Sequence, residues 1–466
     1  MEIISLKSNR ATLSTLSPEE KRNLYITGLR MPQHWKQREA FLQQEPIIKG
    51  IVNKKQMALQ TVHTPFSLCE EMIRKLTEYI GAYPKDLKIL VYNVEFLDIL
   101  YRMGIMWNNE IWFVNENPQQ IQFARDIYVG DGNDKFICSK FLEIDKNMKK
   151  FSVVIGNPPY QTKSEASVTK TQVIWDKFVK KSIDMCEDDG YVCLVHPSGW
   201  RDVHGAFEDT KELILSKDIK YLEMHDMNDG VKTFGAQTMY DWYVLQNKPT
   251  EHNKTTIKGQ DGSSYYKDIS DMKFIPSRMF NEIDNLIAKE GEGKVEIINN
   301  SAYHTQRPHM AKEKSDEIMS LVAKEGEEKV EILHSYSAYE SRKEYVSKTE
   351  TDEFKYPVIY SIKMGDIPTL RYSNTNKKGH FGIPKFIWGN GACTSIGSIV
   401  DADGKYGLTQ FGYAIIDKKE NLPLIKKAFD SLKFKELMKA CPNQNNNINR
   451  KVIALFRKDF WKQFVK

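Results

Sequence analysis

Four consecutive residues, Asn157-Pro158-Pro159-Tyr160, hold the groups best suited to chemistry, and they directly follow the apolar run 151–156. The side-chain oxygen of Asn157 and the backbone carbonyl of Pro158 are hydrogen-bond acceptors, and proline has no N–H group to compete with them. An exocyclic amine on a planar base is a poor nucleophile because its lone pair is delocalised into the ring. Two acceptors that bind both N–H groups favour a more tetrahedral nitrogen, while Tyr160 stacks on the ring. The four residues therefore predict chemistry at the amine of a planar base.

The surrounding elements determine how this motif is interpreted. An Asn-Pro pair alone is typical of an ordinary turn, whereas all four residues directly after an apolar strand are much more specific. Strands are expected near residues 87–92, 111–114, 136, 151–155, 191–196 and 241–245, with helices near 66–80, 97–103, 118–128 and 173–186. This alternation predicts a parallel, doubly wound α/β sheet. Open α/β sheets bind ligands at the carboxyl ends of their strands, which is where Asn157 stands.

Charge is distributed unevenly along the 466 residues. The net charge is +5, yet residues 421–466 contain 11 Lys and Arg against 3 Asp and Glu. Aromatic residues are interleaved with these charges, as expected where a protein tracks a polyanion and touches its bases. The alternative is an amphipathic helical tail with a solvated basic face. Both interpretations stay open at this point.

The chain is long enough for several domains. We expect a helical segment over 1–55, a catalytic domain over 56–250, a linker over 251–350 and a basic C-terminal domain over 351–466. The linker contains a duplication, because residues 283–297 return in similar form at 318–332. Two copies are too few for a solenoid.

Several segments, taken together with Asn157 to Tyr160, resemble the γ-class DNA adenine-N6 methyltransferases of restriction-modification systems and phages, which use S-adenosylmethionine. The matching segments are Thr64-Pro65-Phe66, the strand 113–118 with Glu116, the strand and loop 190–200, and residues 231–238 with Phe234. The family's glycine-rich cofactor loop corresponds here to Leu90 to Leu97, which contains no glycine.

This resemblance implies a Rossmann-like methyltransferase sheet, mostly parallel with one antiparallel edge strand, followed by an α+β target-recognition region. It implies a catalytic role for Asn157, Pro158, Pro159 and Tyr160, and a role for Phe234 in holding a flipped adenine. The residues expected to bind the cofactor are Thr64, Pro65, Phe66, Asn93, Glu95 and Glu116. The residues expected to contact DNA are Lys140, Lys385, Arg450, Lys451, Arg457 and Lys458.

The leading hypothesis is therefore a site-specific DNA adenine-N6 methyltransferase that acts on double-stranded DNA with S-adenosylmethionine, with a restriction endonuclease as a candidate partner. One alternative is a DNA-binding protein that has lost cofactor binding, and another is a protein glutamine methyltransferase. The six cysteines form no CxxC pair, and His63, His196 and His225 lack metal-ligand spacing. We expect no metal site, no membrane span and a cytoplasmic location.

Overall fold

The computed structural model describes Ser17 and residues 64–128, 135–145, 149–163, 171–203, 205–289, 291–295, 297–298, 346–377, 379–391, 395–409, 411–441 and 448–465. The chain divides into two compact units, Met1–Arg278 and Met279–Lys466. The expected helical segment 1–55 (except Ser17) and the second copy of the duplication, 318–332, lie outside the described residues.

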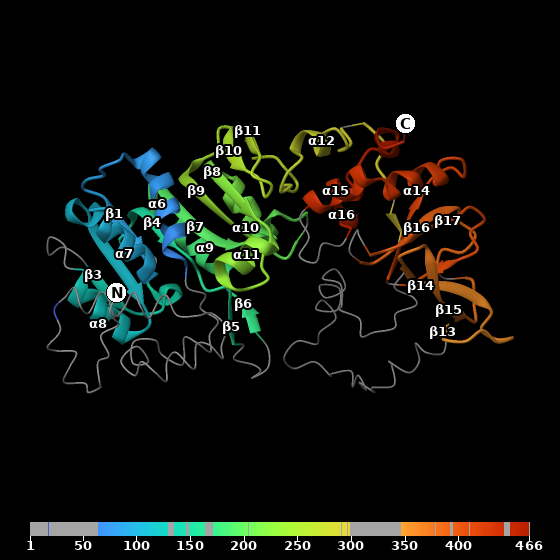
Figure 1. The fold of residues 1–466 in the computed structure, drawn as a ribbon, viewed down its shortest axis with the longest axis horizontal. Coiled ribbons are helices and arrows are strands. Elements are labelled where there is room, and N and C mark those ends of the chain that lie inside the picture. The colour runs from blue at the N-terminus through green and yellow to red at the C-terminus, as the bar shows by residue number, and fades with distance from the viewer. Residues whose placement is uncertain are drawn as a thin grey trace, which may run out of the picture. The chain divides into compact units, whose positions relative to one another are not determined.

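Unit 1 is built on a nine-stranded sheet of order β11-β10-β8-β9-β7-β4-β1-β2-β3 (Figure 1). Its strands are β1 Lys88–Val91, β2 Glu110–Asn115, β3 Lys135–Cys138, β4 Phe151–Gly156, β7 Cys186–Pro197, β8 Lys217–His225, β9 Tyr240–Pro249, β10 Thr255–Lys258 and β11 Ser264–Lys267. A two-stranded ribbon, β5 Gln161–Lys163 with β6 Thr171–Val173, directly follows the Asn157 motif. The six expected strands correspond to β1, β2, β3, β4, β7 and β9, whereas the sequence did not predict β5, β6, β8, β10 and β11.

The strand directions confirm the expected mostly parallel sheet with an antiparallel edge. Neighbouring strands from β3 through β2, β1 and β4 to β7 are parallel, and β11 at the edge is antiparallel to β10. A second antiparallel strand, β9, lies inside the sheet between β7 and β8. Strands β10 and β11 lie beyond residue 250, where the catalytic domain was expected to end.

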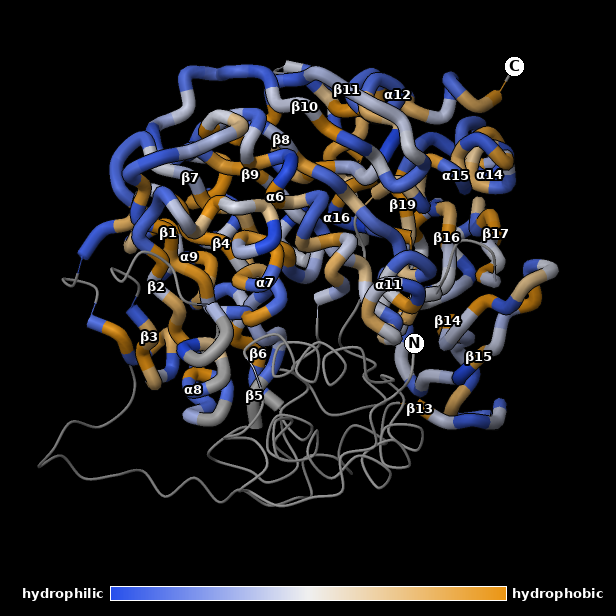
Figure 2. Tube along the Cα trace, turned by 60° about the vertical axis from the view of Figure 1, so that its left-hand side comes forward, coloured by the Kyte–Doolittle hydropathy of each residue, from blue (hydrophilic) through white to orange (hydrophobic). Residues whose placement is uncertain are grey.

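Helices cover both faces of this sheet. They are α6 Phe66–Ile80, α7 Val94–Arg102, α8 Pro118–Ile127, α9 Trp175–Met185, α10 Glu208–Leu215 and α11 Met227–Phe234. In α6 the buried residues Leu68, Met72 and Leu76 form one stripe four residues apart, which packs on the sheet. Ile89 and Val91 belong to this core, whereas the intervening Leu90 is buried on the other face. The strands form the apolar interior (Figure 2).

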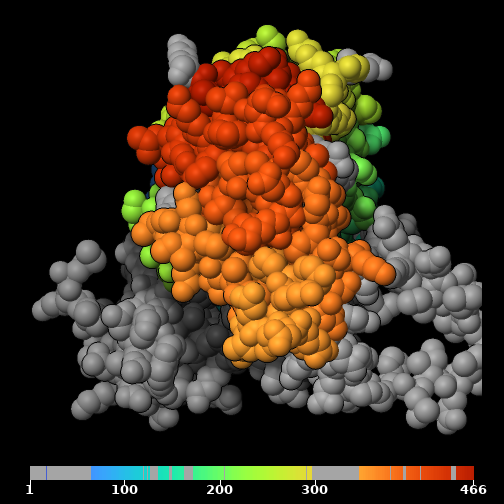
Figure 3. All heavy atoms as spheres, turned by 90° about the vertical axis from the view of Figure 1, so that its right-hand side faces the viewer, coloured from blue at the N-terminus to red at the C-terminus, as the bar shows by residue number. Residues whose placement is uncertain are grey.

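Unit 2 is an α+β structure. Its strands form two four-stranded sheets, of order β12-β19-β16-β17 and β13-β15-β14-β18. The bounds are β12 Ile297–Ile298, β13 Val346–Ser347, β14 Tyr356–Lys363, β15 Ile367–Ser373, β16 Lys385–Gly389, β17 Ser398–Asp401, β18 Gly407–Leu408 and β19 Gly412–Ile416, with helices α12 Phe280–Asp284, α14 Leu422–Asp430, α15 Leu432–Ala440 and α16 Arg450–Ile453. In Figure 3 the orange and red atoms of unit 2 form one continuous surface on the face that is shown.

The C-terminal aromatic residues lie mainly in the core of unit 2. Phe429, Phe434, Phe456 and Phe460 are each at most 5% exposed. Phe429 contacts Phe386 at a ring distance of 4.6 Å and Phe434 at 4.4 Å. These four rings therefore stabilise the fold and are not exposed to touch bases, which favours the amphipathic interpretation of this segment. Within the described residues, no helix is both long and apolar enough to cross a membrane.

Candidate active site

Asn157 lies at the carboxyl end of β4, as the sequence predicts. It is 4% exposed, and its side-chain Nδ2 donates a hydrogen bond of 3.0 Å to Thr64 Oγ1. Thr64 is also buried and directly precedes α6. Pro158 is buried, while Pro159 and Tyr160 are half-buried. The motif is thus a tightly packed turn whose amide contacts the segment that begins α6.

The loop that follows β1 is held against this turn. It consists of Tyr92 and Asn93 alone, because α7 begins at Val94. The backbone N–H of Asn157 donates to Asn93 Oδ1 at 2.6 Å, and Asn93 Nδ2 donates to the Asn157 carbonyl at 3.0 Å. One carboxamide therefore binds both backbone polar groups of Asn157.

Glu95 connects the first turn of α7 to the same network. Its carboxylate Oε1 accepts a hydrogen bond of 3.3 Å from the backbone N–H of Thr64, and the side chain is 4% exposed. Thr64, Asn93 and Glu95 were all expected to bind a cofactor. In the structure they bind Asn157 or one another, so their polar groups hold the turn together.

The other expected cofactor residues are more accessible. Glu116 is exposed directly after β2, at the same edge of the sheet as Asn157. Pro65 and Phe66 are half-buried, and the guanidinium of Arg102 lies 5.1 Å from the ring centre of Phe66. A carboxylate after the second strand suits two ribose hydroxyls, because it has two acceptor oxygens.

Four aromatic rings are in successive contact, from Tyr160 in the motif to His225 at the end of β8. Tyr160 lies edge-on to Phe234 with ring centres 6.4 Å apart, and Phe234 lies edge-on to Tyr240 at 4.8 Å. Tyr240 in turn stacks flat on His225, at 4.3 Å and an angle of 8°. Phe234 ends α11 and is 2% exposed. Burial, reinforced by Tyr240 and Asp241, raises the pKa of the Tyr160 hydroxyl well above its ordinary value, so this group stays protonated.

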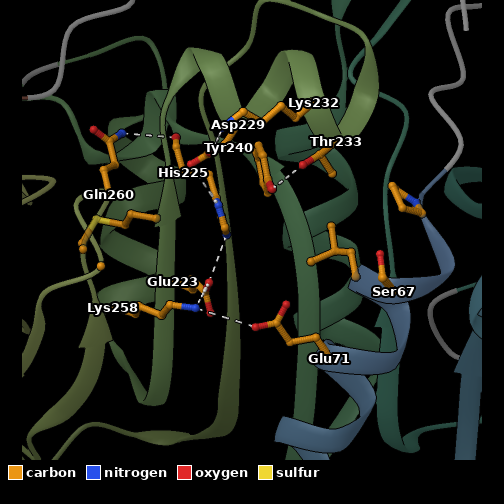
Figure 4. A pocket seen from close by; sticks show the side chains of 15 residues that line it. Ser67, Glu71, Glu223, His225, Asp229, Lys232, Thr233, Tyr240, Lys258 and Gln260 are labelled. Atoms are coloured by element: carbon orange, nitrogen blue, oxygen red, sulfur yellow. Dashed lines mark hydrogen bonds and ion pairs between the residues drawn. The ribbon is translucent and has the colours of Figure 1, made fainter.

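Beyond Tyr240 a pocket of about 500 Å³ opens between the start of α6, α11 and the carboxyl ends of β8 and β10 (Figure 4). Its polar lining residues come from all of these elements and are Ser67, Glu71, Glu223, His225, Asp229, Lys232, Thr233, Tyr240, Lys258 and Gln260. Thr233 Oγ1 and the Tyr240 hydroxyl are 3.0 Å apart. The pocket and Asn157 thus lie at the same edge of the sheet.

Glu223 is the electrostatic centre of this pocket. Its carboxylate accepts hydrogen bonds from Lys258 Nζ at 2.7 Å and from the Tyr221 hydroxyl at 2.6 Å. His225 Nε2 lies 3.3 Å from the same carboxylate, and His225 Nδ1 lies 3.5 Å from Asp229. Burial alone would raise the pKa of Glu223, but His225, Lys258 and Tyr221 together lower it to about 2.

The sequence motifs did not predict this pocket. His225 was noted only for its lack of metal-ligand spacing, and Glu223, Tyr240 and Lys258 were not singled out. One signal was present, because Glu223 and His225 stand two residues apart at the end of a strand and so share a face. Within the described part of the chain, no group of three or more His, Cys, Asp or Glu residues is placed to hold a metal ion.

The expected DNA-contacting residues differ in accessibility. Lys140 is exposed and pairs with Glu143 at 2.8 Å. Lys385 is fully buried and pairs with Asp401 at 2.7 Å, so it has no surface with which to contact a phosphate, and its expected role is corrected to a structural one. The remaining four lie in or next to α16: Arg450 and Lys458 are exposed, whereas Lys451 and Arg457 are half-buried.

Residues 87–234 match the family described as Eco57I restriction-modification methylase. This segment runs from β1 to the end of α11 and contains both Asn157 and Phe234. The match therefore covers the part of unit 1 that carries the motif. No curated protein matches the chain.

Several solved structures are similar to this chain. One, from Listeria monocytogenes, is described as a class I S-adenosylmethionine-dependent methyltransferase. It is 14% identical over 52% of this chain and 86% of that chain, with a TM-score of 0.35. The M protein of the type I restriction enzyme EcoKI is 13% identical over 59% of this chain and 70% of that chain, with a TM-score of 0.33. A nuclease-deletion mutant of the type ISP enzyme LlaGI is 10% identical over 84% of this chain, with a TM-score of 0.46, and the chain spans 53% of its length.

Proposed function

We propose that this protein is a methyltransferase that transfers a methyl group from S-adenosylmethionine to the N6 amine of adenine in double-stranded DNA. The observation that carries the proposal is the position of Asn157 and Pro158 in a turn braced at the carboxyl end of β4. The family match over residues 87–234 supports the restriction-modification setting. In that setting, a restriction endonuclease is the expected partner.

Asn157 and Pro158 prepare the nucleophile in this reaction. The Asn157 Oδ1 and the Pro158 carbonyl accept the two N–H bonds of the adenine amine, which draws its lone pair out of conjugation with the ring. The new N–C bond would form as the S–C bond of the methyl donor breaks, with S-adenosylhomocysteine as the leaving group. Neither oxygen is basic enough to take the amine proton, so the proton would pass to solvent. The role of these acceptors is to stabilise and orient the amine.

Tyr160 holds the base, and Phe234 supports Tyr160 from behind. The amine of adenine lies inside the duplex, so the nucleotide must flip out, and the unstacking penalty is a few kcal/mol. The half-buried ring of Tyr160 offers aromatic contact that offsets part of this penalty. Phe234 was expected to hold the adenine, but it is 2% exposed, so we assign its edge-on ring to the support of Tyr160. Exposed Arg450 and Lys458 are the residues of unit 2 that we assign to the phosphate backbone.

The residues at the ends of β1 and β2 fit S-adenosylmethionine in part. Glu116 would bind the ribose hydroxyls, and Pro65 and Phe66 would contact the ligand beside α6. When bound, the cofactor supplies an electrophilic methyl group. The side chains of Asn93 and Thr64 bind the catalytic turn, and that of Glu95 binds the backbone of Thr64, so we assign all three a supporting role.

The test is methyl transfer itself. The purified protein is incubated with mixed-sequence double-stranded DNA and methyl-labelled S-adenosylmethionine, and the DNA is hydrolysed to nucleosides. Labelled N6-methyladenine is expected with the wild type and not with Asn157→Ala. Thermal unfolding with and without the cofactor provides a second readout, because a ligand that binds only the folded state raises the midpoint.

A second candidate function is DNA binding without catalysis. It is favoured by the short, glycine-free loop Tyr92-Asn93 and by the engagement of Asn93 with Asn157. This candidate predicts no label in DNA and no stabilisation by S-adenosylmethionine, with DNA binding intact. Labelled glutamine in a protein substrate, with no label in DNA, would instead identify a protein methyltransferase.

A further inference from the structure

Two side chains hold the catalytic turn. Asn93 binds the backbone of Asn157, and Thr64 binds the side-chain amide of Asn157. Asn93 accepts from the backbone N–H of Asn157 at 2.6 Å and donates to its carbonyl at 3.0 Å. Thr64 Oγ1 accepts from Asn157 Nδ2 at 3.0 Å. The three residues are far apart in sequence and come from the ends of β1 and β4 and the start of α6.

The contact with Thr64 determines how the Asn157 amide is oriented. The oxygen and nitrogen of a carboxamide lie in one plane, on opposite sides of the Cβ–Cγ bond axis, so the bond from Nδ2 to Thr64 turns Oδ1 away from Thr64. Thr64 in turn is fixed by its own backbone N–H, which donates to the buried Glu95. Rotation of the amide by 180° would break the bond from Nδ2.

The side chain of Asn93 makes an unusual contact for a residue at the start of a helix. Asn93 directly precedes α7, where an asparagine side chain commonly caps the helix, yet it makes no such capping bond. Its carboxamide binds the Asn157 backbone instead. This pairing needs one acceptor and one donor on the same side chain, and asparagine is the short side chain that has both. An aspartate would instead place a second acceptor against the Asn157 carbonyl.

We propose that Thr64 and Asn93 are positioning residues that direct the Asn157 side-chain oxygen toward the amine. Asn93 fixes where the Asn157 backbone lies, and Thr64 fixes which amide atom faces the amine. This inference rests on the proposed function for its kinetic consequence, but the orientation of the amide can be measured without turnover. It gives Thr64 and Asn93 a role distinct from contact with the cofactor.

The kinetic test compares Thr64→Val with Thr64→Ser. Valine has the same shape without the hydroxyl, whereas serine keeps the acceptor. We expect Thr64→Val to lower kcat by about tenfold to a hundredfold, because small displacements of reacting groups have effects of this size. The KM for S-adenosylmethionine should stay within about twofold, and Thr64→Ser should retain most of the activity. A raised KM with unchanged kcat would overturn the proposal and make Thr64 a cofactor contact.

Asn93→Asp provides a second variant of nearly the same size. It should lower kcat as Thr64→Val does, again with little change in KM for S-adenosylmethionine. Both variants are first checked for a thermal unfolding midpoint close to that of the wild type. Wild-type kcat in Asn93→Asp would overturn the assignment of Asn93.

The orientation itself is measured by NMR on protein labelled with ¹⁵N-asparagine. The side-chain amide signal of Asn157 is assigned by its loss in Asn157→Asp. In the wild type its hydrogens should exchange slowly with solvent, and in Thr64→Val exchange should be faster and the signal should shift. Equal signals in both proteins would overturn the proposal. If the wild type transfers no methyl group but this signal shifts, the proposed function fails while the positioning contact stands.

Discussion

Gly156 packs so closely against Tyr92 that a Cβ atom at Gly156 would lie 2.5 Å from Cε2 of the Tyr92 ring. The ring cannot move aside, because it packs against Phe141 at 4.9 Å and Phe178 at 5.8 Å. The same Cβ would lie 2.7 Å from Asn93 Oδ1, the atom that binds Asn157. We therefore expect Gly156→Ala to lower the free energy of unfolding by about 1–3 kcal/mol. Urea unfolding of unit 1 measures this loss.

Gly205→Ala is the matched control for that variant. The nearest atom to a Cβ at Gly205 is 3.5 Å away, an ordinary contact distance. Its free energy of unfolding should stay within about 0.5 kcal/mol of the wild type. Equal effects of the two substitutions would mean that the close approach at Gly156 does not constrain the turn.

Much of unit 1 could be predicted from the sequence because its signals are local. An apolar run and the residues that end it define β4, and the strand alternation places Asn157 at a carboxyl end. The partner of Asn93 could not be predicted in this way, because it lies 64 residues away and depends on β1 pairing with β4. Lys385 shows the same limit. The family resemblance implied that it contacts DNA, but its buried partner Asp401 belongs to another strand.

The stability of unit 1 should depend on His196 at acidic pH. Burial lowers the pKa of His196 from 6.5 to about 4. The folded protein keeps the ring neutral, against Trp175 at 4.6 Å, while the unfolded chain protonates it below about 6.5. Stability from this group is therefore present above pH 6.5 and is lost as the pH falls toward 4. The loss over this range is roughly 3 kcal/mol.

The measurement for His196 compares urea unfolding of the wild type and His196→Phe at several pH values. Phenylalanine keeps an aromatic ring on Trp175 but does not titrate. The variant should be less sensitive to pH between 6.5 and 4 than the wild type. Parallel pH profiles would show that His196 does not titrate with the expected shift.

Lys385 should matter for the stability of unit 2. Its Nζ donates to Asp401 at 2.7 Å and to the carbonyls of His380 and Ile383 at 3.1 Å. Lys385→Met leaves the Asp401 carboxylate buried without its cation, which costs about 3–5 kcal/mol. Adding Asp401→Asn should recover part of the loss in denaturant unfolding. A stable Lys385→Met protein with weakened DNA binding would instead restore the DNA-contact interpretation.

Exposed Arg450 and Lys458 should act on DNA binding and not on stability. Each phosphate contact releases counterions, so the logarithm of the association constant falls with the logarithm of salt concentration by about 0.9 per contact. Replacing both residues by alanine should reduce this slope by about 1.8. Lys439→Ala is the control, because Lys439 already pairs with Glu436 at 2.7 Å and its removal should leave the slope unchanged. Fluorescence anisotropy at four or more salt concentrations measures each slope, and a double variant with the wild-type slope would move the DNA contact away from α16.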